Sequence, residues 1–212
     1  MRRKIEGSAS IKKFLIFLLC CFITLPTLGG NTILIIGDSL STGYGFDANR
    51  SWITLLQNRL KDKNYDYEVI NASISGDTTG NGLARLPLLL KQYLPIITII
   101  ELGGNDGLRG IQLPVIKNNL ARIIALTQEA NSKVLLLGIR LPPNYGQQYT
   151  EQFLQLYSEL VNRYGIAFVP NFLVNVDESN QLMQKDRIHP TGEAQVIILD
   201  NIWPELEKLL TR

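Results

Sequence analysis

The chain has 212 residues, of which 45% are hydrophobic and 19% charged, as expected for an ordinary globular protein with a substantial core. Five of its 21 basic residues but only one of its 19 acidic residues fall in positions 1–29, so the formal charge of +2 becomes slightly negative over the remainder. That balance argues against nucleic acid as a partner.

Positions 1–29 have the pattern of a secretory signal peptide. Basic residues up to Lys13 precede the apolar run Phe14–Ile23, which is short against the roughly 20 residues that a membrane-spanning helix needs. Both cysteines lie in this segment, so residues 30–212 contain none. We therefore predict a signal peptide at 1–29, with an approximate cleavage point, and one exported domain at 30–212 without disulfides. An uncleaved N-terminal anchor is the alternative.

Strand-like and helix-like segments alternate along the rest of the chain. Continuous apolar runs predict strands at 32–38, 66–73, 95–104, 133–140 and 166–170. Apolar residues at helical spacing predict helices at 51–63, 83–94, 113–130, 149–165 and 189–210. Pro87 predicts a kink or a start in the second helix, and Pro190 and Thr191 suit the first turn of the last one. This order predicts a single α/β domain with a doubly wound, parallel, five-stranded sheet flanked by helices.

Polar residues follow three of these strands, at the sheet edge where ligands bind in such folds. Asp38 and Ser39 follow the first strand, Gly76 the second and Asn105 the third. Taken singly, each is equally typical of a turn or a helix cap. A fourth polar segment, 186–190, precedes the last helix and contains the sequence's single histidine.

These segments together contain the parts of a nucleophilic catalyst. The hydroxyl of Ser39 needs a base, and the imidazole side chain of a histidine such as His189 is the usual one. Asp186, three residues before His189, is placed to hold the ring in one tautomer. The backbone N–H groups of Ser39 and Gly76, with the amide of Asn105, are candidate donors to a developing oxyanion.

The four segments, in this order, resemble the blocks of the SGNH or GDSL hydrolase superfamily. The likeness rests on Gly-Asp-Ser-Leu at 37–40 and on the longer runs "NASISGDT", "GLARLP", "ELGGNDGLRG" and "IRLPPNYG". It implies a flavodoxin-like sheet of five parallel strands and an enzyme without metal or cofactor. It also implies Ser39 as nucleophile, His189 as base and Asp186 as its partner, with Gly76 and Asn105 completing the oxyanion hole. The nearest branch is bacterial and periplasmic, with acyl-CoA thioesterase, lysophospholipase and arylesterase activities.

The resemblance also implies a shallow groove for an acyl chain, walled by the loops after the third and fourth strands. The candidate substrate-contacting residues are Asp38, Leu108, Ile111, Leu141, Pro142 and Tyr145. The apolar members of this set are equally suited to packing beneath their own turns. We expect an acyl ester or thioester, small or lipid, as substrate, and a monomer in the periplasm or outside the cell. No stable membrane insertion is expected once the signal is removed.

Other functions remain as alternatives. A carbohydrate O-acetyl esterase of the same superfamily is the nearest, followed by a non-catalytic periplasmic binding protein. Nucleotide-binding glycine motifs are missing after the first strand. A phosphatase that used Asp38 would need a second carboxylate at position 40, which is leucine. The single histidine disfavours a metal hydrolase, although a carboxylate-only site stays open.

Overall fold

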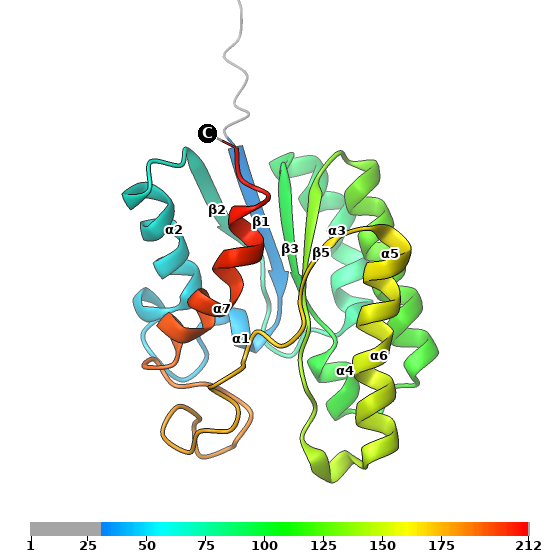
Figure 1. Ribbon diagram of the computed structural model, residues 1–212. Coiled ribbons are helices and arrows are strands. Elements are labelled where there is room, and N and C mark those ends of the chain that lie inside the picture. Colours follow the sequence, from blue (N-terminus) through cyan, green and yellow to red (C-terminus); the bar gives the residue numbers. More distant parts are fainter. Residues whose placement is uncertain (1–30, 212) are drawn as a thin grey trace, which may run out of the picture.

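The computed structural model describes residues 31–211, so the predicted signal peptide lies outside the described residues. Five parallel strands form one sheet in the order β2-β1-β3-β4-β5 (Figure 1). The strands are β1 (Asn31–Gly37), β2 (Tyr67–Asn71), β3 (Ile97–Glu101), β4 (Lys133–Leu137) and β5 (Ala167–Val169). The predicted fold class is confirmed.

Strands β1 and β3 are mostly apolar because helices cover both faces of the sheet. Residues Ile33 to Ile36 of β1 and the isoleucines of β3 have no exposed side-chain surface. The register pairs Ile33 with Ile97 and Gly37 with Glu101. The carboxyl ends of β1 and β3 are therefore level, and the residues that follow them emerge side by side.

The longer helices form a layer on each side of the sheet (Figure 1). On one side α2 (Trp52–Asp62) packs against α7 (Gln195–Glu207). On the other side α5 (Leu113–Glu129) lies between α3 (Thr79–Tyr93) and α6 (Gln147–Tyr164). Within residues 31–211, no helix has the length and apolar character needed to cross a membrane.

Four short helices, none of them predicted, lie in the loops. They are α1 (Ser39–Thr42), α4 (Gly104–Leu108) and the 3₁₀ helices η1 (Ala48–Arg50) and η2 (Pro143–Tyr145). The first two begin directly after β1 and β3, at the carboxyl edge of the sheet (Figure 1). They hold two of the four polar segments that the sequence singles out.

Two helix starts differ from the prediction by more than two residues. Helix α3 begins at Thr79 rather than at position 83 and continues through Pro87. Helix α7 begins at Gln195, so Pro190 and Thr191 are not in its first turn. Instead Gln184 N–H donates to the His189 carbonyl at 2.8 Å and Thr191 N–H to the Leu182 carbonyl at 2.7 Å. These bonds hold the chain around His189 in an extended bridge, which is incompatible with a helical turn there.

Candidate active site

Ser39 is presented by a tight turn between β1 and α1. The Asp38 carboxylate caps α1 by accepting a hydrogen bond from Leu40 N–H at 3.1 Å, and Ser39 is the first residue of that helix. A Cβ on Gly37 would lie only 2.7 Å from Glu101 Oε2, so only glycine fits at this point of the turn. The serine is thus held half-buried at the carboxyl edge of the sheet.

A continuous hydrogen-bond relay joins Ser39, His189 and Asp186. His189 Nε2 lies 2.8 Å from Ser39 Oγ, across 150 positions of sequence. On the other side of the ring, His189 Nδ1 lies 2.7 Å from Asp186 Oδ2. The ring of Tyr44 packs against the imidazole with centroids 4.4 Å apart, which limits its rotation. The structure therefore brings the three predicted residues into the order that a catalytic triad needs.

The charge of Asp186 fixes the proton positions along this relay. Partial burial raises the pKa of Asp186, but hydrogen bonds from the His189 ring and from the backbone N–H groups of His189 and Ile188 outweigh it and lower the pKa to about 2. A carboxylate is only an acceptor, so Nδ1 of His189 carries the proton. The lone pair of Nε2 therefore faces the Ser39 hydroxyl.

The residues of the three predicted oxyanion donors, Ser39, Gly76 and Asn105, line the same cleft. Within residues 31–211, no acceptor is paired with the backbone N–H of Ser39 or of Gly76. Gly76 has φ of 82°, and Arg109 Nη2 donates to its carbonyl at 3.0 Å. The third donor is engaged: Asn105 Nδ2 donates to Asp38 Oδ2 at 2.8 Å and to the Asp77 carbonyl at 3.1 Å. An oxyanion would share the amide hydrogens of Asn105 with these acceptors.

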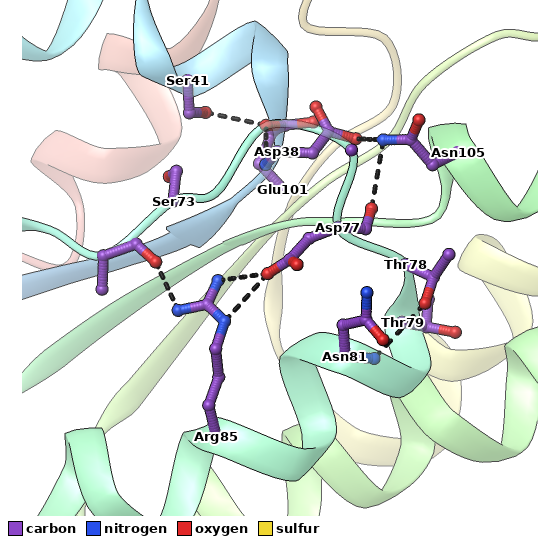
Figure 2. A network of polar contacts seen from close by, with 12 residues as sticks. Asp38, Ser41, Ser73, Asp77, Thr78, Thr79, Asn81, Arg85, Glu101 and Asn105 are labelled. Atoms are coloured by element: carbon purple, nitrogen blue, oxygen red, sulfur yellow. Dashed lines mark hydrogen bonds and ion pairs between the residues drawn. The ribbon is translucent and has the colours of Figure 1, made fainter.

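Two buried carboxyl groups lie behind the nucleophile turn (Figure 2). Glu101 Oε2 accepts from Asp38 N–H at 3.1 Å and from Ser41 Oγ–H at 2.8 Å. Burial raises the pKa of Asp38 to about 6, against the opposing hydrogen bonds from Leu40 N–H and Asn105. Burial and the nearby Asp38 raise the pKa of Glu101 well above its usual range. Glu101 braces the turn from inside the protein, whereas Asp38 also lines the cleft that contains Ser39.

An ion pair between Arg85 and Asp77 anchors the neighbouring loop. Arg85 of α3 donates through Nε to Asp77 Oδ2 at 2.8 Å and through Nη1 to the Ala72 carbonyl (Figure 2). Thr42 Oγ1 and Ser75 Oγ lie 2.8 Å apart and tie α1 to the same loop. The segment that contains Gly76 is therefore fixed at both ends relative to Ser39.

Ser39 and His189 line a cleft of about 860 Å³, open at the carboxyl edge of the sheet. Its apolar walls come from widely separated parts of the chain: Leu40, Tyr44, Leu108, Ile139, Leu141, Pro142, Pro143, Leu173, Met183 and Ile188. Charged side chains at Arg140, Asp177, Glu178 and Arg187 also border it. Among the described residues, no group of three or more His, Cys, Asp or Glu side chains could hold a metal ion.

Comparison with known proteins agrees with this geometry. Residues 35–197 match the model of the GDSL-like lipase/acylhydrolase family. The chain belongs to that family. It is similar to esterase TesA of Pseudomonas aeruginosa, with 49% identity over 90% of this chain and 96% of the relative. It is also similar to thioesterase 1/protease 1/lysophospholipase L1 of Escherichia coli, with 43% identity over 92% of each chain.

A solved structure gives the same fold. The crystal structure of TesA superposes with a TM-score of 0.83 at 49% identity, covering 84% of this chain and 99% of that one. The protein is thus a GDSL-type esterase or thioesterase in fold and family, as the sequence blocks predict.

The structure separates the predicted substrate-contacting residues of this GDSL hydrolase into two groups. Leu108, Leu141 and Pro142 line the cleft, and so does Asp38 at its floor. Ile111 and Tyr145 do not. Ile111 packs against the core, and the Tyr145 hydroxyl donates to the Leu108 carbonyl at 3.0 Å, which ties the loop after β4 to α4. These two residues therefore support the loops beside the cleft and are not part of its lining.

Several cleft residues of the hydrolase escape sequence reasoning. Ile139 and Leu173 read as strand-end or loop residues, and Met183, Arg187 and Ile188 as parts of a polar stretch. The positions of Arg187 and Ile188 between Asp186 and His189 are the local signal that could have indicated these two residues. The others are brought to the cleft by chain crossings that no local pattern reveals.

Proposed function

We propose that the protein hydrolyses carboxylic esters and thioesters of lipid-type acyl groups, with Ser39 as nucleophile, His189 as general base and acid, and Asp186 as the group that orients His189. The observation that carries this proposal is the relay of 2.8 Å and 2.7 Å through Ser39, His189 and Asp186, at the floor of an apolar cleft. The names of the two relatives, an esterase and a thioesterase/lysophospholipase, support the same reaction class.

The reaction follows from the proton positions. As Ser39 Oγ attacks the substrate carbonyl carbon, its proton moves to Nε2 of His189, and Asp186 stabilises the imidazolium that forms. The negative charge on the carbonyl oxygen is bound by the N–H groups of Ser39 and Gly76 and shares the amide of Asn105. Collapse of this intermediate breaks the ester or thioester bond, and His189 returns the proton to the leaving alcohol or thiol.

The second half of the cycle uses the same groups. Water enters in place of the leaving group and gives a proton to His189 Nε2 as its oxygen attacks the acyl-enzyme carbonyl. Breakdown of the second intermediate releases the carboxylic acid and returns the proton to Ser39. The acyl chain lies on the apolar wall that includes Leu108, Ile139 and Leu141, where each buried methylene contributes about 0.8 kcal/mol.

The position in the cell belongs to the same proposal. The basic and apolar pattern of residues 1–29 supports export across the inner membrane, with a monomeric enzyme acting in the periplasm or outside the cell. Fractionation of cells that express the full chain, followed by the mass of the exported form, tests the export and the cleavage point together.

The catalytic proposal is tested by Ser39→Ala. We expect kcat/KM on a p-nitrophenyl ester to fall at least about 10³-fold, because members of a triad act as a unit. A fluorophosphonate probe labels the wild-type protein and not the variant. Ser179→Ala, which removes a serine outside the cleft, keeps both the activity and the label. Ester hydrolysis retained by Ser39→Ala at more than a few per cent of wild type contradicts the proposal.

A further inference from the structure

Arg187 occupies an unusual backbone conformation beside the catalytic relay. Its φ is 58°, in the left-handed region that non-glycine residues seldom adopt. Four other non-glycine residues of the described chain have positive φ, and three of them are asparagines, whose short side chain tolerates it. Arginine has no such local compensation, so its side chain needs a separate explanation.

The hydrogen bonds of the turn explain the positive φ at position 187, but they do not explain why the residue is an arginine. Asp186 Oδ1 accepts from the backbone N–H groups of both Ile188 and His189, each at 3.0 Å, and Arg187 N–H donates to the Gln184 carbonyl at 3.0 Å. This tight turn requires a left-handed residue at position 187. Glycine or asparagine would satisfy it with less strain.

Arg187 is also a cation at the border of the cleft. Arg187 borders the cleft and is exposed, and within residues 31–211 it forms no ion pair. The other cleft arginine, Arg140, faces Glu178 at 3.9 Å, and Asp177 accepts from Asn171. Arg187 is therefore the cleft cation that has its donors available for a ligand.

The position of Arg187 identifies which part of a substrate it would meet. His189 must reach the leaving oxygen to return a proton to it, so residues on the turn of His189 border the leaving group. In the proposed binding mode the acyl chain lies on the apolar wall that includes Leu108, Ile139 and Leu141. A cation two residues from the base therefore meets an anionic group that lies a few bonds beyond the scissile ester.

We propose that Arg187 is a specificity-determining residue that binds the phosphate of a lysophospholipid leaving group. Three glycerol carbons separate the ester oxygen from the phosphate oxygen in such a substrate, whereas the phosphates of an acyl-CoA are separated from the thioester by the long pantetheine arm. Arginine recognises phosphate through paired, charge-assisted hydrogen bonds. This inference rests on the proposed function, since it assumes that His189 serves the leaving group.

The test compares substrates that share one acyl chain: 1-myristoyl lysophosphatidylglycerol, 1-myristoylglycerol, which lacks the phosphate, and myristoyl-CoA. In Arg187→Asn the kcat/KM ratio of the first to the second falls about tenfold, mainly through KM, while Arg187→Lys loses only part of the preference. Lys185→Asn removes the same charge from the same loop outside the cleft, and it leaves the ratio at its wild-type value. Because strain is relieved, Arg187→Asn also unfolds at a higher temperature than wild type.

Each contrary result has a distinct meaning. An unchanged ratio in Arg187→Asn, or an equal fall in Lys185→Asn, overturns a specific contact to phosphate. A fall in the ratio of myristoyl-CoA to 1-myristoylglycerol without one for the lysophospholipid assigns the contact to the coenzyme and overturns the lysophospholipid assignment. A wild-type protein that hydrolyses none of the three substrates contradicts the proposed function instead.

Discussion

The proposed role of Asn105 as an oxyanion donor depends on the two residues that orient its side-chain amide. Its amide nitrogen is held between Asp38 Oδ2 at 2.8 Å and the Asp77 carbonyl at 3.1 Å (Figure 2). These two acceptors fix the direction of the side chain before any substrate binds. A donor that is already oriented costs no reorganisation when charge develops on the substrate oxygen, and this is the property that makes an oxyanion hole effective.

At this scale we predict the effect of Asn105→Ala. Removing one preorganised donor should lower kcat about 10²- to 10³-fold while KM changes little, because the contact strengthens in the transition state. Steady-state kinetics on a short p-nitrophenyl ester measures both constants. Asn119→Ala is the control, since that asparagine donates to Thr79 Oγ1 outside the cleft. A rise in KM at constant kcat would show that Asn105 serves only ground-state binding.

Helix α3 shows how tertiary contacts fix an element's start. The segment 78–82 contains two glycines, an asparagine and two threonines, which is typical of a loop. The buried Asp106 carboxylate accepts from Thr79 N–H at 2.8 Å and from Thr79 Oγ1–H at 2.5 Å, and these bonds satisfy donors that a helix start leaves unpaired. Helix α3 therefore begins four residues earlier than its apolar spacing predicts.

The two glycines of this helix give a matched prediction at the scale of the element. A Cβ on Gly82 would lie 2.4 Å from Leu102 Cδ1, so Gly82→Ala should lower the free energy of unfolding by about 1–3 kcal/mol through overpacking. A Cβ on Gly80 meets nothing closer than 3.7 Å, so Gly80→Ala should raise it by up to about 1 kcal/mol through helix propensity. Urea unfolding measures both. Equal effects of the two substitutions would contradict the close packing of α3 on Leu102.

For the molecule as a whole, the dependence of stability on pH reflects two carboxyl groups whose pKa values are shifted in opposite directions, Asp38 and Asp186. Asp38 has a pKa raised from 3.8 to about 6, so the fold favours its neutral form. Its contribution to stability is full below pH 3.8 and is lost as the pH rises through 6. Asp186 has a pKa lowered from 3.8 to about 2, so its contribution is present above pH 3.8 and is lost as the pH falls toward 2.

We predict that Asp38→Asn removes the loss of stability that accompanies a rise in pH through 6. In the wild-type protein the Asp38 carboxyl should lower the free energy of unfolding by about 2 kcal/mol between pH 4 and pH 8. The variant should show a flatter slope over that range, whatever constant loss follows from its altered contact with Asn105. Urea unfolding at one-unit steps of pH gives the two slopes. Parallel slopes would mean that the fold does not raise the pKa of Asp38.

The amino-acid sequence by itself determines the strands and the chemistry of this protein. Apolar runs define the buried strands because only side chains without polar groups fit between two helical layers. The contact between Asp186 and His189 is also local, since the two residues are three positions apart in one turn. The proposed roles of Ser39, Gly76 and Asn105 follow from the groups that acyl transfer requires.

Only the tertiary structure decides the contacts between distant segments. The 2.8 Å distance between His189 Nε2 and Ser39 Oγ depends on the sheet order and on the bridge between Met183 and Pro190. The sequence pattern instead predicts a helical turn at this bridge. The same holds for the cleft wall at Ile139, Leu173 and Met183, and for Ile111 and Tyr145, which pack elsewhere. Local patterns report which face of an element is buried, whereas the neighbour that buries it is set by how the whole chain folds.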